Sequence, residues 1–304
     1  MISGHEGRSA PTNKTSLSRR LRNAARSAEL PEGRLQRQLG VLVVAELLGR
    51  VRSENDQKLF LVKGGSSIEM RLGIPSTRTS KDLDAVFRGD FTQMYDAARN
   101  TLEAGWNGFT AVTTPPETIE VPGSPTKPRR FRVKLSFKGQ SWCTVPVEVS
   151  PAEASSADNV DMVSPAPFAE VGLASLGLPE VEPVACLPLR YQIAQKLHAC
   201  TAPAPEPRRN DRAHDLIDIL LLWPLVPTEE YDVVHKACVE IFTARSGHSW
   251  PPEMVVHAHW AVLYERELAT MLEVGDIPGN VQDAATAVAE IVGSIDAAGV
   301  TGPG

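Results

Sequence analysis

The amino-acid sequence predicts a bilobed α/β (α+β) protein, in which a mixed sheet with helices forms the N-terminal lobe and helices form the C-terminal lobe. Up to about residue 150, short apolar runs alternate with helical patterns, whereas from Pro188 onward the pattern is helical almost throughout. A stretch rich in Ala, Ser and Pro separates the two parts. We therefore expect a basic, partly disordered segment at residues 1–30, an α/β domain at 31–165 and a helical domain at 166–304.

Each element of the first lobe is expected from the spacing of its apolar residues and from the residues that bound it. The expected helices lie at residues 35–48, 66–72 and 91–104, with Ser66 or Ser67 as a natural N-cap of the second. The residues at 138–141 (Lys-Gly-Gln-Ser) favour a hairpin turn between the last two strands. The expected strands lie at 59–62, 82–87, 108–114, 131–137 and 142–149.

The second lobe combines apolar helical periodicity with two polar stripes. Gln192 and Lys196 are four residues apart, and Asp211, Asp215 and Asp218 are four and three apart, so each set lies on one face of a helix. The simplest interpretation of these stripes is a surface ion pair between neighbouring helices, which stabilises a protein little. Helices are expected at 189–200, 211–222, 228–243, 253–272 and 281–295.

The composition indicates a globular cytoplasmic protein with no membrane partner. The 304 residues carry a net charge of −6 and contain no run of eighteen apolar residues. The N-terminus is polar and Arg-rich and lacks the apolar stretch of a secretory signal. The four cysteines are far apart and form no CxxC pair, which favours reduced thiols over a disulfide or zinc framework.

The segment from Gly64 to Asp84 carries the strongest functional signal. A strand that stops at Gly64-Gly65 and continues as a helix brings backbone N–H groups close to whatever lies beyond the strand end. The helix N-terminus adds a partial positive charge, so the site suits a phosphate. Ser66 and Ser67 add hydroxyl donors. These four residues are therefore candidate phosphate-binding residues.

Two carboxylates follow one helix later. Asp82 and Asp84 occupy alternate positions of the expected strand, so their side chains point to the same face. The strand is otherwise apolar, and an unneutralised acidic pair within the core is costly. A shared Mg²⁺ removes the conflict, because it takes carboxylate oxygens together with substrate phosphates. The alternative is a solvent-exposed acidic edge, but the nearby glycine-serine loop favours the metal.

Four sequence blocks, in this order, resemble a known family. Residues 62–67 (Val-Lys-Gly-Gly-Ser-Ser) and 78–84 (Arg-Thr-Ser-Lys-Asp-Leu-Asp) are similar to the Gly-Gly-Ser and Arg-x-Ser-x-Asp-x-Asp signature of the AbiEii-type nucleotidyltransferase toxins. These toxins belong to the DNA polymerase β-like superfamily. Residues 192–199 and 211–219 resemble the Lys-Leu and Asp-Leu-x-Asp helices of that family. In their order and residues, the blocks particularly resemble those of the mycobacterial MenT-type toxins.

The resemblance implies roles for individual residues of the first lobe. Gly65 and Ser66 would cradle a nucleoside triphosphate (NTP), and Asp82 and Asp84 would bind Mg²⁺. The superfamily usually supplies a third carboxylate from a later strand, and Glu148 is the candidate here. The alternative is that Glu148 faces solvent on an edge strand.

The resemblance also implies roles for the polar stripes of the second lobe. Lys196 would neutralise charge as pyrophosphate leaves. Either Asp215 or Asp218 would hold that lysine or a ribose hydroxyl in place. Gln192 and Asp211 join the candidate nucleotide-binding residues.

The function that the resemblance implies is Mg²⁺-dependent transfer of a nucleoside monophosphate (NMP) to the 3′ acceptor end of tRNA. Such an enzyme would block translation as a toxin and would have a cognate antitoxin protein. Two alternatives stay open: nucleotidyl transfer to a small molecule or a protein side chain, and a catalytically inactive nucleotide- or RNA-binding module.

A basic stretch lies on the expected hairpin before Glu148. In a nucleotide-transferring enzyme, it is well placed to meet the phosphates of a polynucleotide acceptor, and binding would weaken steeply with salt. The alternative is a solvated basic hairpin. The candidate RNA-binding residues are Lys127, Arg129, Arg130, Arg132 and Lys134.

Ser80 is a candidate regulatory residue as well as a candidate nucleotide neighbour. It precedes Asp82 by two residues and is expected at the mouth of the metal site. A phosphate on Ser80 would add a charge of roughly −1.5 to −2, which would repel NTP and compete for Mg²⁺. We therefore expect phosphorylation of Ser80, or its replacement by Glu, to inactivate the protein.

Overall fold

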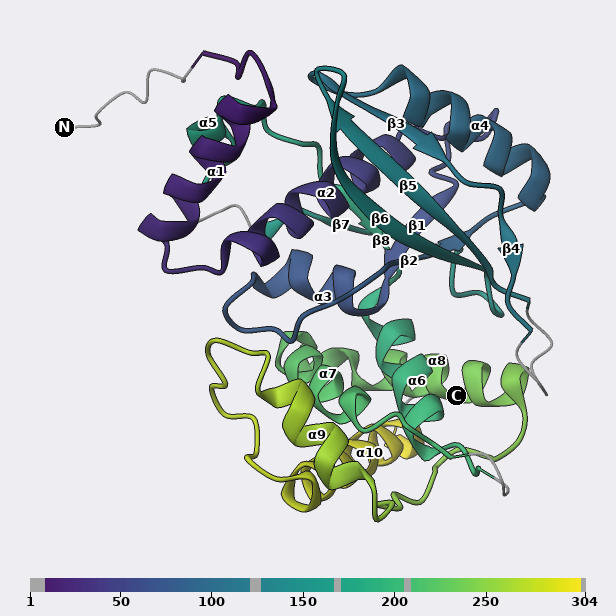
Figure 1. The fold of residues 1–304 in the computed structure, drawn as a ribbon. Helices are drawn as coiled ribbons and strands as arrows, with labels where there is room; N and C mark the ends of the chain where they lie inside the picture. The colour runs from purple at the N-terminus through teal and green to yellow at the C-terminus, as the bar shows by residue number, and fades with distance from the viewer. Residues whose placement is uncertain (1–8, 121–126, 167–170, 205–208, 302–304) are drawn as a thin grey trace.

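The computed structural model describes residues 9–120, 127–166, 171–204 and 209–301. In Figure 1 a sheet with covering helices forms the upper lobe, and a group of helices forms the lower lobe. This arrangement confirms the expected mixed α/β fold with a C-terminal helical lobe. No described helix combines the length and the apolar character that crossing a membrane requires.

The sheet has eight strands in the order β3-β5-β6-β2-β1-β8-β7, and β4 pairs with β5 at one side. Pairs β2–β6 and β1–β8 are parallel and the others are antiparallel, so the sheet is mixed. Lys138 and Gly139, with φ of 48° and 77°, form the expected turn between β5 and β6. The strands are β1 (Phe60–Lys63), β2 (Leu83–Phe87), β3 (Phe109–Thr113), β4 (Glu117–Thr118), β5 (Arg129–Phe137), β6 (Gln140–Pro151), β7 (Asp161–Val163) and β8 (Val184–Cys186).

Two helices precede the sheet. α2 (Glu32–Leu48) is buried along most of its length and packs against β6 and α4 (Phe91–Ala104). α1 (Lys14–Ser27) lies within the segment where the sequence indicated partial disorder, and residues 1–8 of that segment lie outside the described residues. Asn13 caps α1, and the helix buries Leu17, Leu21 and Ala25, which are four residues apart. Only these few apolar residues mark α1 in the sequence, because the rest of the helix is polar and basic.

Helix α3 (Gly64–Leu72) begins two residues earlier than expected, and its N-cap is Lys63 rather than Ser66 or Ser67. Gly64 has a φ of +65°, a left-handed conformation that favours glycine. A Cβ at this position would also lie 2.5 Å from Asp84 Oδ2. The chain therefore turns from β1 into α3 directly against Asp84, and both serines fall inside the first turn of the helix.

The helical lobe contains α6 (Leu189–Thr201), α7 (His214–Leu222), α8 (Tyr231–Arg245), α9 (Trp260–Leu268) and α10 (Val281–Thr301), and the short α5 (Leu173–Leu176) precedes it. Two expectations were wrong at the helix starts. The helix expected at 211–222 begins at His214, and the one expected at 253–272 begins at Trp260. The indole of Trp260 donates a hydrogen bond to the Asn210 carbonyl oxygen, so the segment before α7 contacts the start of α9.

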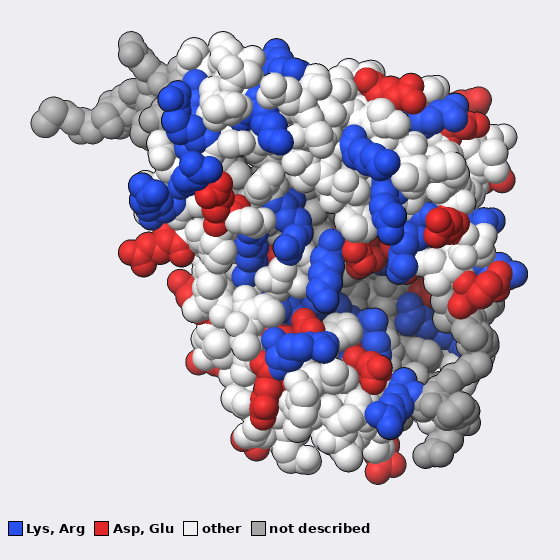
Figure 2. All heavy atoms as spheres, in the orientation of Figure 1, with Lys and Arg blue, Asp and Glu red and all other residues white. Residues whose placement is uncertain are grey.

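Strand alternation divides the sheet between two apolar clusters. On β1, Phe60 and Val62 pack with the cluster of the first lobe, whereas Leu61 packs with the helical lobe. The same alternation on β2 turns Val86 toward the helical lobe. Figure 2 shows basic side chains gathered over β5 and along the junction of the two lobes. The helical lobe thus covers the sheet face at β1 and β2, while the same face carries charged side chains farther along.

Candidate active site

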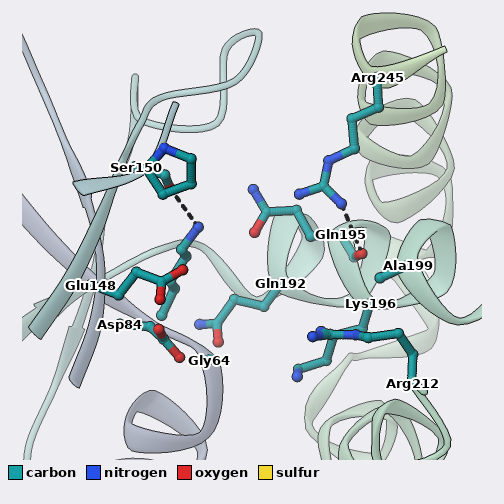
Figure 3. Close-up of a pocket in the computed structure, with 12 residues that line it drawn as sticks. Gly64, Asp84, Glu148, Ser150, Gln192, Gln195, Lys196, Ala199, Arg212 and Arg245 are labelled. Carbon is teal, nitrogen blue, oxygen red and sulfur yellow. Dashed lines mark hydrogen bonds between the residues drawn. The ribbon is translucent and has the colours of Figure 1, made fainter. Parts of the chain in front are cut away.

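A row of charged residues crosses the sheet where the apolar cover ends. The register pairs Lys63 of β1 with Asp84 of β2, Asp84 with Glu148 of β6, and Glu148 with Arg130 of β5. Residues in register on neighbouring strands share a face, here the face that Leu61 turns toward the helical lobe. Figure 3 shows Asp84 and Glu148 side by side at the edge of a cleft between the lobes. Glu148 therefore lies beside Asp84 in the cleft.

The acidic pair in this row is electrostatically unbalanced. Burial raises the pKa of Asp84 to about 6, and the negative charges of Glu148 and Asp82 act in the same direction against the opposing charge of Lys63. Arg130 Nη2 lies 2.9 Å from Glu148 Oε2 and compensates that carboxylate in part. The ammonium of Lys63 donates to Ser150 Oγ at 2.6 Å, and burial lowers the pKa of Lys63. An additional cation beside Asp84 would relieve the excess of negative charge.

The donor set fits a magnesium ion that is held by few protein ligands. Asp84 and Glu148 both line the cleft, whereas Asp82 lies in the bend before β2, which begins one residue later than expected, and is not among the lining residues. Among the described residues, no three His, Cys, Asp or Glu side chains lie close enough to hold a metal ion by themselves. Mg²⁺ is commonly bound by one or two carboxylates with substrate phosphates and water completing its shell. The carboxylate pair on adjacent strands matches that pattern.

The glycine-serine loop approaches the site through its backbone rather than its hydroxyls. Ser66 and Ser67 are fully buried. Ser66 Oγ donates to the Asp82 carbonyl oxygen at 2.8 Å, and Ser67 Oγ accepts from Gln192 Nε2 at 3.0 Å. The hydroxyls that the sequence suggested as phosphate donors are therefore turned into the protein. Gly65 lies against Ser80, since a Cβ on it would be 2.9 Å from Ser80 Oγ.

The helical side of the cleft holds a chain of alternating charges. Lys196 Nζ lies 2.6 Å from Asp218 Oδ2 and 3.1 Å from Asp215 Oδ1. Arg78 reaches from the loop before β2 and donates to both oxygens of Asp218, at 2.8 and 2.7 Å. Arg212 Nε donates to Asp215 Oδ2 at 2.6 Å. The lysine and both aspartates are thus brought together, and each aspartate also has an arginine partner.

The linked ion pairs on the helical side of the cleft are electrostatically balanced. Burial alone would raise the pKa of Asp215, but Arg212 and Lys196 lower it to about 2. Arg78 and Lys196 likewise overcome the effect of burial and hold the pKa of Asp218 well below its usual range. Both carboxylates therefore stay ionised, and Lys196 has a fixed position at the cleft.

Asp211 is not brought to the cleft. Because α7 starts at His214, Asp211 lies before the helix and is not one turn from Asp215. Its side chain is 68% exposed and pairs with His259 at 2.9 Å. Its proposed contact with nucleotide has no support in this geometry.

The five basic candidates on and before β5 separate into two groups. Arg130, Arg132 and Lys134 are exposed and alternate with buried apolar residues, so they share the sheet face that carries Glu148. Arg129 instead places its guanidinium 5.2 Å from the centre of the Phe91 ring, and Lys127 lies 3.5 Å from Glu120. Only the first group continues the charged row.

Several cleft residues received no role from the sequence. Lys63, which lines the cleft, and Arg78, which binds Asp218 beside it, lie inside the sequence blocks that resemble the family, and this was the signal available for them. Arg212 lies inside the block at 211–219 that resembles the family. No sequence signal singles out Arg245, which forms a two-pronged ion pair with Glu153 at the opposite end of the cleft.

A model of one protein family matches most of the chain. The family model described as "Nucleotidyl transferase AbiEii toxin, Type IV TA system" matches residues 46–290. Among solved structures, the chain is similar to MenT4, a nucleotidyltransferase toxin from Mycobacterium tuberculosis H37Rv, with 16% identity and a TM-score of 0.44. That alignment covers 91% of this chain and 98% of MenT4. No curated protein matches the sequence.

Proposed function

The chain belongs to the family of AbiEii nucleotidyltransferase toxins of toxin–antitoxin systems, and from this premise we propose that it transfers NMP from an NTP to the 3′ end of tRNA with Mg²⁺. The 3′ oxygen of the acceptor attacks the α-phosphorus and releases its proton to water, and the bond to the β-phosphate breaks, so pyrophosphate leaves. A cognate antitoxin protein would restrain this activity, and the protein would act in the cytoplasm.

The observation that carries the proposal is the pairing of two unlike walls across one cleft. Asp84 and Glu148, with Asp82 beside them, would hold Mg²⁺ on the sheet wall. Bound Mg²⁺ would neutralise carboxylates and phosphates and align the attacking and leaving oxygens. On the other wall, Lys196 is held in place by Asp215 and Asp218, so its charge can meet the departing pyrophosphate without rearrangement.

The glycine loop supports binding of the triphosphate at the same place. Gly64 lies directly against Asp84, so the backbone at the start of α3 is close to the carboxylates. The N–H groups of this first turn, together with the helix dipole, favour an anion. Gly64 lines the cleft and is the part of the loop best placed to contact phosphate, whereas Ser66 and Ser67 are fully buried.

An RNA acceptor is favoured by the basic residues that continue the charged row. Arg130, Arg132 and Lys134 are exposed on the same sheet face as Glu148. A polynucleotide whose 3′ end enters the cleft could therefore lay its backbone phosphates along β5. An enzyme that modifies a small molecule or a protein side chain has no need of this surface.

The test is a transfer assay with purified protein, Mg²⁺, total tRNA and each α-labelled NTP in turn. The expected result is label on RNA, its loss with Asp82→Ala, and its loss when the RNA 3′ end is oxidised. Asp211→Ala is the matched control, because Asp211 is exposed outside the cleft, and it should retain transfer. Label on protein alone would favour the alternative acceptor, and no label with any NTP would favour an inactive binding module.

A further inference from the structure

Four cationic side chains line the cleft, namely Lys63, Lys196, Arg212 and Arg245. Each of the first, second and fourth of these already donates hydrogen bonds to the protein. The ammonium of Lys63 donates to Ser150 Oγ, and that of Lys196 is shared by two aspartates. All three nitrogen atoms of the Arg245 guanidinium are used, two on Glu153 and one on the Gln195 carbonyl oxygen. These groups contribute charge to the cleft but offer few directed donors.

Arg212 differs from the other three. Its Nε donates to Asp215 Oδ2 at 2.6 Å, while neither terminal nitrogen, Nη1 or Nη2, has a hydrogen bond to a described residue. The side chain is 47% exposed, whereas Asp215, which holds it, is completely buried. Figure 3 shows Arg212 beside Lys196, with its guanidinium directed into the cleft. A buried carboxylate thus fixes the inner edge of the guanidinium and leaves its outer edge free.

A triphosphate bound at the glycine loop would need a further hydrogen-bond donor from the helical wall. The hydroxyls of Ser66 and Ser67 are committed to protein partners, so the loop can offer a phosphate only its backbone N–H groups. A triphosphate presents several anionic oxygens, and those turned away from the loop must be met from the helical wall. A guanidinium with two parallel N–H donors matches a phosphate in two-pronged geometry.

We propose that Arg212 binds the terminal phosphates of the NTP and the leaving pyrophosphate, and that Asp215 is the positioning residue that aims it. This assignment rests on the proposed function only in requiring that an NTP enters the cleft. It gives Asp215 a task distinct from that of Asp218: Asp215 orients a phosphate donor as well as Lys196, whereas Asp218 links Lys196 to Arg78. The competing account is a solvated surface ion pair, which would leave phosphate binding unchanged.

The test is equilibrium binding of inorganic pyrophosphate, each NTP and each NMP to the full-length protein with Mg²⁺, using wild type and Arg212→Gln. Loss of a hydrogen-bonded charge on phosphate should weaken NTP and pyrophosphate by about tenfold or more, while the NMP affinity stays within about twofold. Arg212→Lys should fall between wild type and Arg212→Gln, because a lysine restores the charge but not the paired donors.

The matched control is Arg209→Gln, because Arg209 is an exposed arginine three residues earlier that lies outside the cleft lining. It should bind all ligands as wild type does. Unchanged pyrophosphate binding by Arg212→Gln, or an equal loss for NTP and NMP, would overturn the proposal. The thermal midpoint of each variant separates a binding loss from partial unfolding. Because no RNA is present, this result is independent of whether the labelled product in the transfer assay is RNA.

Discussion

The two walls of the cleft differ in how far nearby cations neutralise their buried carboxylates. On the sheet wall, the pKa of Asp84 is raised to about 6 by burial and by neighbouring carboxylates. On the helical wall, Asp215 and Asp218 are more deeply buried than Asp84, yet cations on both sides lower the pKa of each. The sheet wall therefore carries an excess of negative charge, whereas the charges of the helical wall are balanced.

The difference separates what the fold supplies from what the substrate must bring. The charge chain of the helical wall needs no ligand, so Lys196 is positioned before nucleotide arrives, which avoids reorganisation during the reaction. An added cation would make the sheet wall more favourable, and under the proposed function that cation would arrive with the triphosphate. Binding of metal and NTP would then be coupled to the side of the cleft that lacks charge balance.

The largest expected effect comes from removing the imbalance. Asp84→Asn should reduce nucleotide transfer by about 10³-fold, because it deletes a charged ligand of the proposed metal. The same substitution should leave the free energy of unfolding without metal unchanged or higher, because burial disfavours the ionised form of Asp84 more than Lys63 stabilises it. Transfer assays and thermal unfolding in chelator measure the two effects. A clear loss of stability would contradict the unbalanced wall.

The pH dependence of the free energy of unfolding tests independently whether the charge on Asp84 destabilises the folded protein. The pKa of Asp84 is about 6 in the folded protein and about 3.9 in an unfolded chain. As the pH falls from 6 to 4, the folded state takes up a proton that the unfolded state does not, so wild type gains stability from this group. The stability advantage of Asp84→Asn in denaturation experiments should therefore be full near pH 8 and disappear toward pH 4.

The next effect should come from breaking the balanced wall. Arg78→Met leaves Asp218 buried with one partner fewer and should lower the free energy of unfolding by about 3 kcal/mol. Combining it with Asp218→Leu should cost less than the sum of the two single changes, because no carboxylate then lacks its arginine. Arg99→Met is the control: its pair with Asp96 is exposed, and the change should cost less than about 0.5 kcal/mol. Chemical denaturation measures all four variants.

A third change adds negative charge to the sheet wall, where negative charge is already in excess. Ser80 Oγ lies against Gly65 and donates to the Asp82 carbonyl oxygen at 3.1 Å. Ser80→Glu brings another carboxylate to the metal and phosphate site and should lower transfer by about 10²-fold, whereas Ser80→Ala should stay within a few fold. Activity across a range of Mg²⁺ concentrations tests this. Wild-type activity of Ser80→Glu would argue against Ser80 as a regulatory position.

The sequence was sufficient for features that depend on local pattern. Apolar runs located most strands, and the spacing of Asp215 and Asp218 placed both on one face of a helix, while the resemblance to the family connected them with Lys196. The two glycines marked the turn against Asp84, where a side chain has no room.

Features that depend on tertiary contacts were not accessible in the same way. Asp211 seemed to share a helix face with Asp215, but the helix starts only after it. Serine favours the N-cap position, yet the Ser66 hydroxyl donates a hydrogen bond to the Asp82 carbonyl oxygen, which lies outside the helix. Arg78 meets Asp218 across 140 residues of chain, and no spacing rule reports such a contact.

The smallest effect concerns the basic face that continues the sheet wall along β5. Arg132→Ala should raise the KM for tRNA a few fold and leave the KM for NTP unchanged, because the residue is exposed on the face of Glu148 but lies beyond it. The slope of log affinity for tRNA against log salt should become shallower by roughly 0.7 to 0.9, as expected when one phosphate contact is lost. Arg129→Ala is the matched control, since its guanidinium packs on Phe91 and it should keep the wild-type slope. Equal slopes for both variants would mean that RNA takes a different path into the cleft, and the imbalance of the sheet wall would then have to be met by metal alone.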